Sequence, residues 1–194
     1  MNPLPEIAAA SGPRHVEATL LQPSQLLETA TDVLLQGLHL LFQLDDSVYT
    51  RVAPAPYGAS IGSHFRGVLE PLQCLVTGFR PGEIDYDTPE RNARVEREVV
   101  YASVTCCDLL RAFKRFTQDT LAKSCVVMCS GAAEHHRPSR AESTIGRELE
   151  YCIGRALHHF DVIRLICEAM RVRVPEEFRD ASAARKLLSG LVAH

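Results

Sequence analysis

Residues 145–170 decide the fold of this chain, because they carry a long helical stripe of apolar side chains. The segment reads IGRELEYCIGRALHHFDVIRLICEAM. Steps of four and three residues connect its inward positions: Ile145, Leu149, Cys152, Ala156, His159, Ile163, Ile166 and Met170. This spacing is typical of the inward seam of a helix in a bundle. The segment therefore predicts a core helix that begins near Ser143 or Thr144 and ends near Arg171.

His159 is the one clearly polar residue on this seam. A buried imidazole costs free energy unless it has a hydrogen-bond partner. A second stripe repeats the pattern with Ile61, His64, Val68, Leu72 and Leu75. Two inward histidines from two helices are the usual beginning of a metal site inside a bundle. Taken without further context, the same pattern favours two core histidines that bond to each other or to Tyr and Glu side chains.

The rest of the chain shows similar periodicity. Further helices are predicted over residues 24–43, 60–78, 88–116 and, near the end, 182–191. The second of these contains Pro71, which should kink or loosen it. Residues 45–59 and 82–87 are expected to be loops. Four long helices with narrow seams predict an all-α, up-and-down four-helix bundle.

Two shorter segments complete the predicted organisation. The apolar run Cys125–Cys129, followed by a polar stretch, predicts either a short hairpin or a loop before the last bundle helix. Residues 1–20 contain three prolines and no periodicity, so they are expected to form a loosely ordered arm. Residues 21–194 are expected to form a single helical domain.

Composition restricts the class of function. The chain has 194 residues, of which 46% are hydrophobic, and a net charge of −3, so no nucleic-acid or anionic-membrane surface is expected. No apolar run approaches the roughly 20 residues of a membrane span, and no leader peptide is apparent. The seven cysteines are an odd number and fall on helical stripes or in the short apolar run. Free, buried cysteines of this kind indicate a reducing compartment, the cytoplasm.

Four motifs, in order, resemble the DinB-like superfamily: SIGSHFRGVLE at 60–70, IDYD at 84–87, STIGRELE at 143–150 and HHF at 158–160. The resemblance covers roughly residues 25 to 180. It implies a four-helix bundle with a central pocket. Many members bind a divalent metal through three histidines, one from the second helix and two from a later helix spaced His-x-x-x-His. Some relatives are thiol transferases that use low-molecular-weight thiols such as bacillithiol or mycothiol, and others have no assigned activity.

The resemblance can be carried over for only two of the three ligands. His64 matches the ligand on the second helix and His159 matches the second histidine of the later pair. The first histidine of that pair is replaced by Arg155, which has no lone pair, stays protonated and repels a cation. His39 flanks the apolar stripe of the helix predicted over residues 24–43 and is a candidate for a third ligand. Cys152 shares the seam of His159 but lies two turns away, ~10 Å along the helix axis.

These observations predict a pocket that contains His64, His159, Arg155 and Cys152, with no assigned catalytic residue. The first hypothesis is a pocket of the metal-dependent transferase or hydrolase type, with zinc, nickel, manganese or iron and a low-molecular-weight thiol as the small-molecule ligand. The second is a metal-free, non-enzymatic binding or scaffold protein. The third is a pocket that binds a small anion through Arg155. A homodimer is expected in either of the first two cases.

Overall fold

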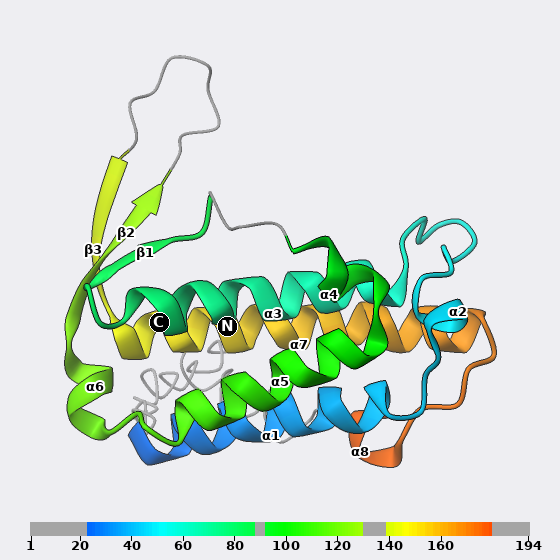
Figure 1. The fold of residues 1–194 in the computed structure, drawn as a ribbon, viewed down its shortest axis with the longest axis horizontal. Helices are drawn as coiled ribbons and strands as arrows, with labels where there is room; N and C mark the ends of the chain where they lie inside the picture. Colours follow the sequence, from blue (N-terminus) through cyan, green and yellow to red (C-terminus); the bar gives the residue numbers. More distant parts are fainter. Residues whose placement is uncertain (1–22, 88–91, 130–138, 180–194) are drawn as a thin grey trace, which may run out of the picture.

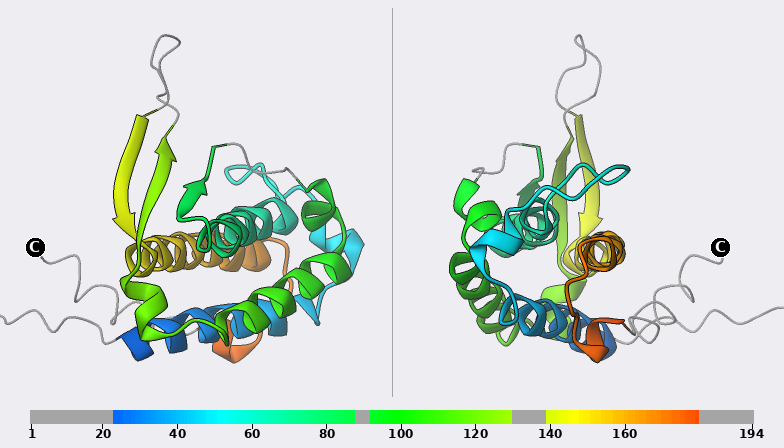
Figure 2. Two further views of the ribbon diagram at one scale, coloured as in Figure 1. Left: turned by 60° about the vertical axis from the view of Figure 1, so that its left-hand side comes forward. Right: turned by 90° about the vertical axis from the view of Figure 1, so that its right-hand side faces the viewer.

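The computed structural model describes residues 23–87, 92–129 and 139–179. The predicted N-terminal arm, the predicted helix at 182–191 and the predicted helix start at Thr88 lie outside these residues. The long helices are α1 (Pro23–Leu41), α3 (Ile61–Gly78), α5 (Val99–Phe113) and α7 (Ile145–Ala169). Both α1 and α3 pack against α5 and α7, so the four helices form a closed square when seen from the end (Figure 2). The predicted all-α four-helix bundle is confirmed.

The predicted seams face the interior of this bundle. Ile61, Leu75 and Leu149 of these seams are 0% exposed, as burial of an apolar stripe requires. The helix starts follow from local chemistry. Ser60 caps α3 by a reciprocal pair of hydrogen bonds with Ser63. The Thr144 side chain caps α7 by accepting from the Arg147 backbone N–H.

The helix predicted over 88–116 is interrupted, which corrects the sequence-based expectation. A short helix α4 (Ala93–Arg97) precedes α5, and Glu98 between them is extended, with φ −125° and ψ 109°. The cause is a set of tertiary contacts from α2 (Asp46–Tyr49), a four-residue helix inside the predicted loop 45–59. The Asp46 carboxylate accepts from the Val99 N–H at 2.8 Å, and the Tyr49 hydroxyl donates to the Val95 carbonyl at 2.7 Å.

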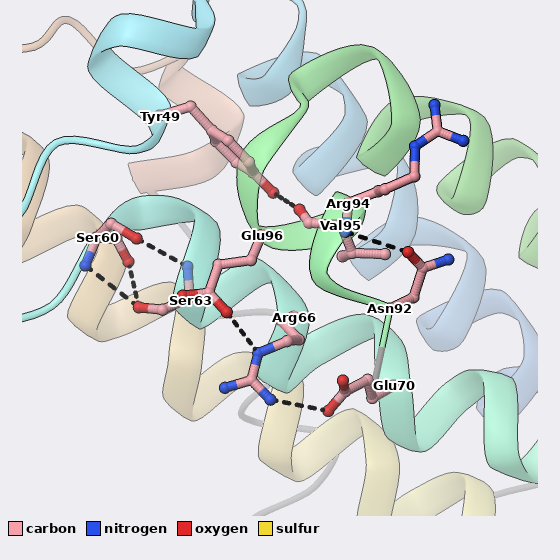
Figure 3. A network of polar contacts seen from close by, with 9 residues as sticks. All are labelled: Tyr49, Ser60, Ser63, Arg66, Glu70, Asn92, Arg94, Val95 and Glu96. Atoms are coloured by element: carbon pink, nitrogen blue, oxygen red, sulfur yellow. Dashed lines mark hydrogen bonds and ion pairs between the residues drawn. The ribbon is translucent and has the colours of Figure 1, made fainter. Parts of the chain in front are cut away.

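The close approach of α4 to α3 depends on one glycine. A Cβ at Gly62 would lie 2.0 Å from the Glu96 carbonyl oxygen. One turn further along α3, the Arg66 side chain donates to the Glu96 carboxylate at 2.9 Å and to Glu70 at 3.3 Å (Figure 3). These contacts hold α4 against the first half of α3.

Pro71 lies inside α3, and the helix continues through it from Ile61 to Gly78. The predicted loosening therefore does not end the helix. Because proline has no N–H, the Gly67 carbonyl, four residues earlier, lacks its ordinary helical partner.

A three-stranded sheet stands at one end of the bundle. The strands β2 (Ser124–Cys129) and β3 (Ser139–Thr144) are antiparallel, which confirms the hairpin rather than the loop. The strand β1 (Glu83–Asp85) pairs in parallel with β2, so part of the predicted loop 82–87 is a strand. The sheet order is β1-β2-β3, and the hairpin projects beyond the helices (Figure 1). Three residues are too few for alternation to reveal a strand in the sequence.

Two short helices and one loop complete the described chain. The helices are α6 (Gln118–Ala122), before the hairpin, and α8 (Glu176–Arg179), which packs on α1. Between α2 and α3 the chain forms a small loop that is closed where the Ala53 N–H donates to the Ala59 carbonyl at 2.9 Å. Among the described helices, none has both the length and the apolar character that a membrane span requires.

Candidate functional site

The two histidines singled out by the seams meet between α3 and α7. His64 lies in the first turn of α3 and His159 in the second half of α7. Their Nδ1 atoms are 3.0 Å apart and their ring centroids 5.3 Å apart. One Nδ1 therefore carries a hydrogen and donates it to the other, which must be the acceptor. This hydrogen bond satisfies the Nδ1 atom of each ring.

Gly67 makes room for this pair. It lies one turn after His64 on the same face of α3. A Cβ at this position would lie 2.5 Å from His159 Nε2 and 2.6 Å from His159 Cε1. Only a glycine allows the imidazole to rest on the α3 backbone. Sequence reasoning missed this residue, although its spacing of three from His64 was a usable signal.

Burial and neighbouring positive charge keep both rings neutral. Burial lowers the pKa of His159 to about 4, with further lowering from His64, Arg155 and His158. Burial also lowers the pKa of His64, and the nearby His158 lowers it further. Near neutral pH the pair is therefore an uncharged hydrogen-bonding unit, in spite of its two basic groups.

The residues present do not complete a metal site. Zinc in proteins normally has three or four protein ligands. Across residues 23–87, 92–129 and 139–179, no group of three His, Cys, Asp or Glu side chains is placed to hold an ion. His39, the third ligand considered above, is exposed on α1, and His158 is exposed on α7. The positive charge of Arg155 further disfavours a cation beside His159.

A polar cavity of about 240 Å³ lies beside the pair. It is bounded by α3, by α7 and by the segment that follows β1. Its lining residues are Gly67, Glu70, Pro71, Cys74, Tyr86, Asp87, Tyr151 and Arg155. Arg155 is exposed and forms no ion pair with any described residue. Of the four residues predicted to share a pocket, Arg155 lies on the lining of this cavity, whereas His64, His159 and Cys152 do not.

Tyr86 forms one wall of the cavity and is held by a buried carboxylate. Its hydroxyl donates to Glu148 Oε2 at 3.0 Å, and Ser143 donates to Glu148 Oε1 at 2.6 Å. Burial raises the pKa of Tyr86, so the phenol stays protonated. Sequence reasoning missed Tyr86 and Glu148, although both lie in the motifs at 84–87 and 143–150.

Cys152 lies behind Tyr86, away from solvent. It is 1% exposed, and its sulfur is 3.7 Å from the Tyr86 hydroxyl. Burial raises the pKa of the Cys152 thiol to about 12. Because the thiolate is the reactive form of cysteine, this thiol is unreactive near neutral pH.

The fold agrees with that of known DinB-like proteins. The crystal structure of YjoA, a DinB-like protein of Bacillus subtilis, superposes with a TM-score of 0.57. The match covers 79% of this chain and 97% of YjoA, at 12% sequence identity. The chain therefore has the DinB-like fold, as its motifs implied.

Sequence comparison adds one partial similarity. FK506-binding protein 5 of Rhizopus delemar is 26% identical over 95 residues, which are 49% of this chain. The match spans about a quarter, 25%, of that protein's length. No family model matches the chain.

Proposed function

We propose that this chain is a DinB-like binding protein whose cavity between α3 and α7 receives a small anionic molecule through Arg155. The single observation that supports the proposal is the position of this guanidinium. It lines the cavity without an ion pair to any described residue, next to a histidine pair that is neutral. A guanidinium in such a place is suited to carboxylate or phosphate groups.

The rest of the cavity suits a ligand that also donates hydrogen bonds. The Gly67 carbonyl lacks its helical partner because of Pro71. Glu70 has one buried carboxylate oxygen without a hydrogen-bond partner among the described residues. A small thiol that carries a carboxylate and an amine, the class that the DinB-like resemblance implies, matches both kinds of group. The ligand would bind by charge and hydrogen bonding, with no step through a metal.

A thermal-shift screen tests this proposal. Cysteine and other anionic low-molecular-weight thiols, with inorganic phosphate, are added to the full chain. A ligand at 100 times its Kd stabilises a protein by about 2.7 kcal/mol, which corresponds to a Tm increase of roughly 5–10 °C at this chain length. In Arg155→Gln the increase should be lost. In the matched control Arg147→Gln, which removes an exposed charge from the same helix, it should be retained. An equal Tm increase in both variants, or none in the wild type, contradicts the proposal.

The competing proposal is a divalent metal, zinc, nickel, manganese or iron, bound by His64 and His159. It is favoured by the convergence of the two Nδ1 atoms at 3.0 Å. Metal analysis of protein purified without an affinity tag should then find close to one ion per chain. Arg155→His would add a third nitrogen one turn from His159 and should strengthen binding. Wild type without metal contradicts the metal proposal, and metal binding by Arg155→His would then identify Arg155 as the residue that prevents it.

A reducing compartment, the cytoplasm, is part of the proposal. It is supported by the six cysteines whose side chains are described, all of which are free thiols. Burial raises the pKa of Cys106 and Cys167, like that of Cys152, to about 12. Such thiols belong to the core and need no oxidising environment.

A further inference from the structure

The cavity between α3 and α7 continues past Glu70 into a larger hollow. Glu70 and Cys74 line both the cavity and this neighbouring hollow, which has a volume of about 540 Å³. The other walls of the hollow include Asp85 of β1 and Tyr101 of α5. The two spaces therefore meet on the surface of α3 around Glu70, and a ligand in the cavity has room to extend beyond that point.

The junction of the two spaces has a negative electrostatic potential. Among the described residues that line the cavity or the hollow, Arg155 is the only lysine or arginine, and it lines the cavity alone. At Cys74, which belongs to the junction, the effect of the carboxylates is visible. Burial raises the pKa of the Cys74 thiol, and the nearby Glu70 and Asp85 raise it further. A site that disfavours a thiolate in this way favours a positively charged group.

Glu70 has one carboxylate oxygen to offer to such a group. Arg66 donates to Glu70 Oε2 at 3.3 Å (Figure 3), whereas the buried Oε1 has no hydrogen-bond partner among the described residues. One turn earlier on α3, the Gly67 carbonyl lacks its ordinary helical partner because residue 71 is a proline. A buried acceptor without a donor costs free energy. An unsubstituted ammonium group carries three N–H donors and can satisfy both acceptors.

Two tyrosine rings on the lining add to the attraction for a cation. Tyr86 and Tyr151 both line the cavity, and their ring centroids are 5.7 Å apart. The faces of aromatic rings attract ammonium groups. The cation–π contacts between described residues involve the rings of Phe79 and Tyr101 instead. The rings of Tyr86 and Tyr151 are therefore available to a cation supplied by a ligand.

We propose that the cavity binds a small amino acid whose amine is free, and that Glu70 is the residue that selects for the ammonium group. The inference rests on the proposed function, because Arg155 still receives the carboxylate. At about 240 Å³ the cavity is smaller than the roughly 300–1,000 Å³ of sites for drug-sized ligands, so it suits a molecule of this size. Selection against an acylated amine is by charge and not by size, because the hollow beyond Glu70 has room for an acyl group.

Isothermal titration calorimetry of the full chain with three related probes tests the inference. The probes are L-cysteine, 3-mercaptopropionate, which lacks the amine, and N-acetyl-L-cysteine, in which the amine is acylated. The Kd of cysteine should be lower than that of either other probe by roughly tenfold or more. In Glu70→Gln the affinity for cysteine should fall roughly tenfold, whereas that for 3-mercaptopropionate should not fall. Tyr151→Leu should weaken cysteine binding roughly threefold, and Tyr151→Phe, which keeps the ring, should restore it.

The matched control is Glu96→Gln. Glu96 is the other carboxylate that Arg66 binds, at 2.9 Å, and it does not line the cavity. This variant should bind cysteine as wild type does, and circular dichroism should show that all variants are folded. Cysteine binding that Glu70→Gln leaves unchanged overturns the inference. Equal Kd values for the three probes, all lost in Arg155→Gln, overturn the inference and leave the proposed function standing. Absence of binding by every probe, or equal binding of all three by Arg155→Gln and wild type, overturns both.

Discussion

Acidification should destabilise this fold through the histidine pair. The pKa of His159 is about 4 in the folded chain and 6.5 in ordinary solution. Between these values the unfolded chain binds a proton that the folded chain excludes, so stability rises with pH. The contribution is fully present above the unfolded pKa and is lost as pH falls toward 4. From about pH 7.5 to about pH 5 the loss is about 2 kcal/mol for a fully buried ring and about 1 kcal/mol after allowance for solvent screening.

Urea denaturation across this pH range measures the effect. The window lies above the ordinary pKa of carboxyl groups, so histidines dominate the slope. In His159→Leu the dependence of the unfolding free energy on pH should be visibly shallower than in wild type. The matched control His39→Gln removes a histidine from the exposed side of α1 and should keep the wild-type slope. Equal slopes for wild type and His159→Leu, or greater stability at pH 5, would refute the account of a buried neutral pair.

Two core positions offer further tests by chemical denaturation. Gly67→Ala should destabilise the chain by about 1–3 kcal/mol, because its Cβ would lie 2.5 Å from His159 Nε2. Gly154→Ala, whose Cβ would meet nothing within 4 Å, is the control and should stabilise α7 by about 0.5–1 kcal/mol; a loss in both variants would point to a backbone cause. Tyr49→Phe leaves the Val95 carbonyl unpaired and should cost about 1–2 kcal/mol; a neutral result would mean that this hydrogen bond does not position α4.

The elements that periodicity defines could be predicted from the sequence. The seams of α3 and α7 place His64 and His159 on inward faces, and packing of the two helices brings the rings together. The break at Glu98 could not be predicted, because it depends on Asp46 and Tyr49, which lie about fifty residues earlier. Propensity in one segment contains no information about such distant contacts.

The cavity was harder to predict than the histidine pair. The IDYD motif at 84–87 supports the family resemblance, but nothing in its spacing shows that Tyr86 forms the cavity wall. Its role requires Glu148, which reaches it from α7 at 3.0 Å. Arg155 could be recognised as a replaced ligand, but its place on the cavity lining depends on the packing of α7 against α3 and on the segment after β1, which only the structure shows.

The closed loop between α2 and α3 has a practical consequence. The hydrogen bond between Ala53 and Ala59 joins the two ends of the segment from Pro54 to Gly58. A peptide inserted at the tip of this loop would have its two ends held close together by the scaffold. The free-energy cost of the insertion would then be the entropy lost in closing a longer loop, which grows slowly with loop length. This tip is therefore the natural place to graft an epitope or a fluorescent reporter without touching the cavity between α3 and α7.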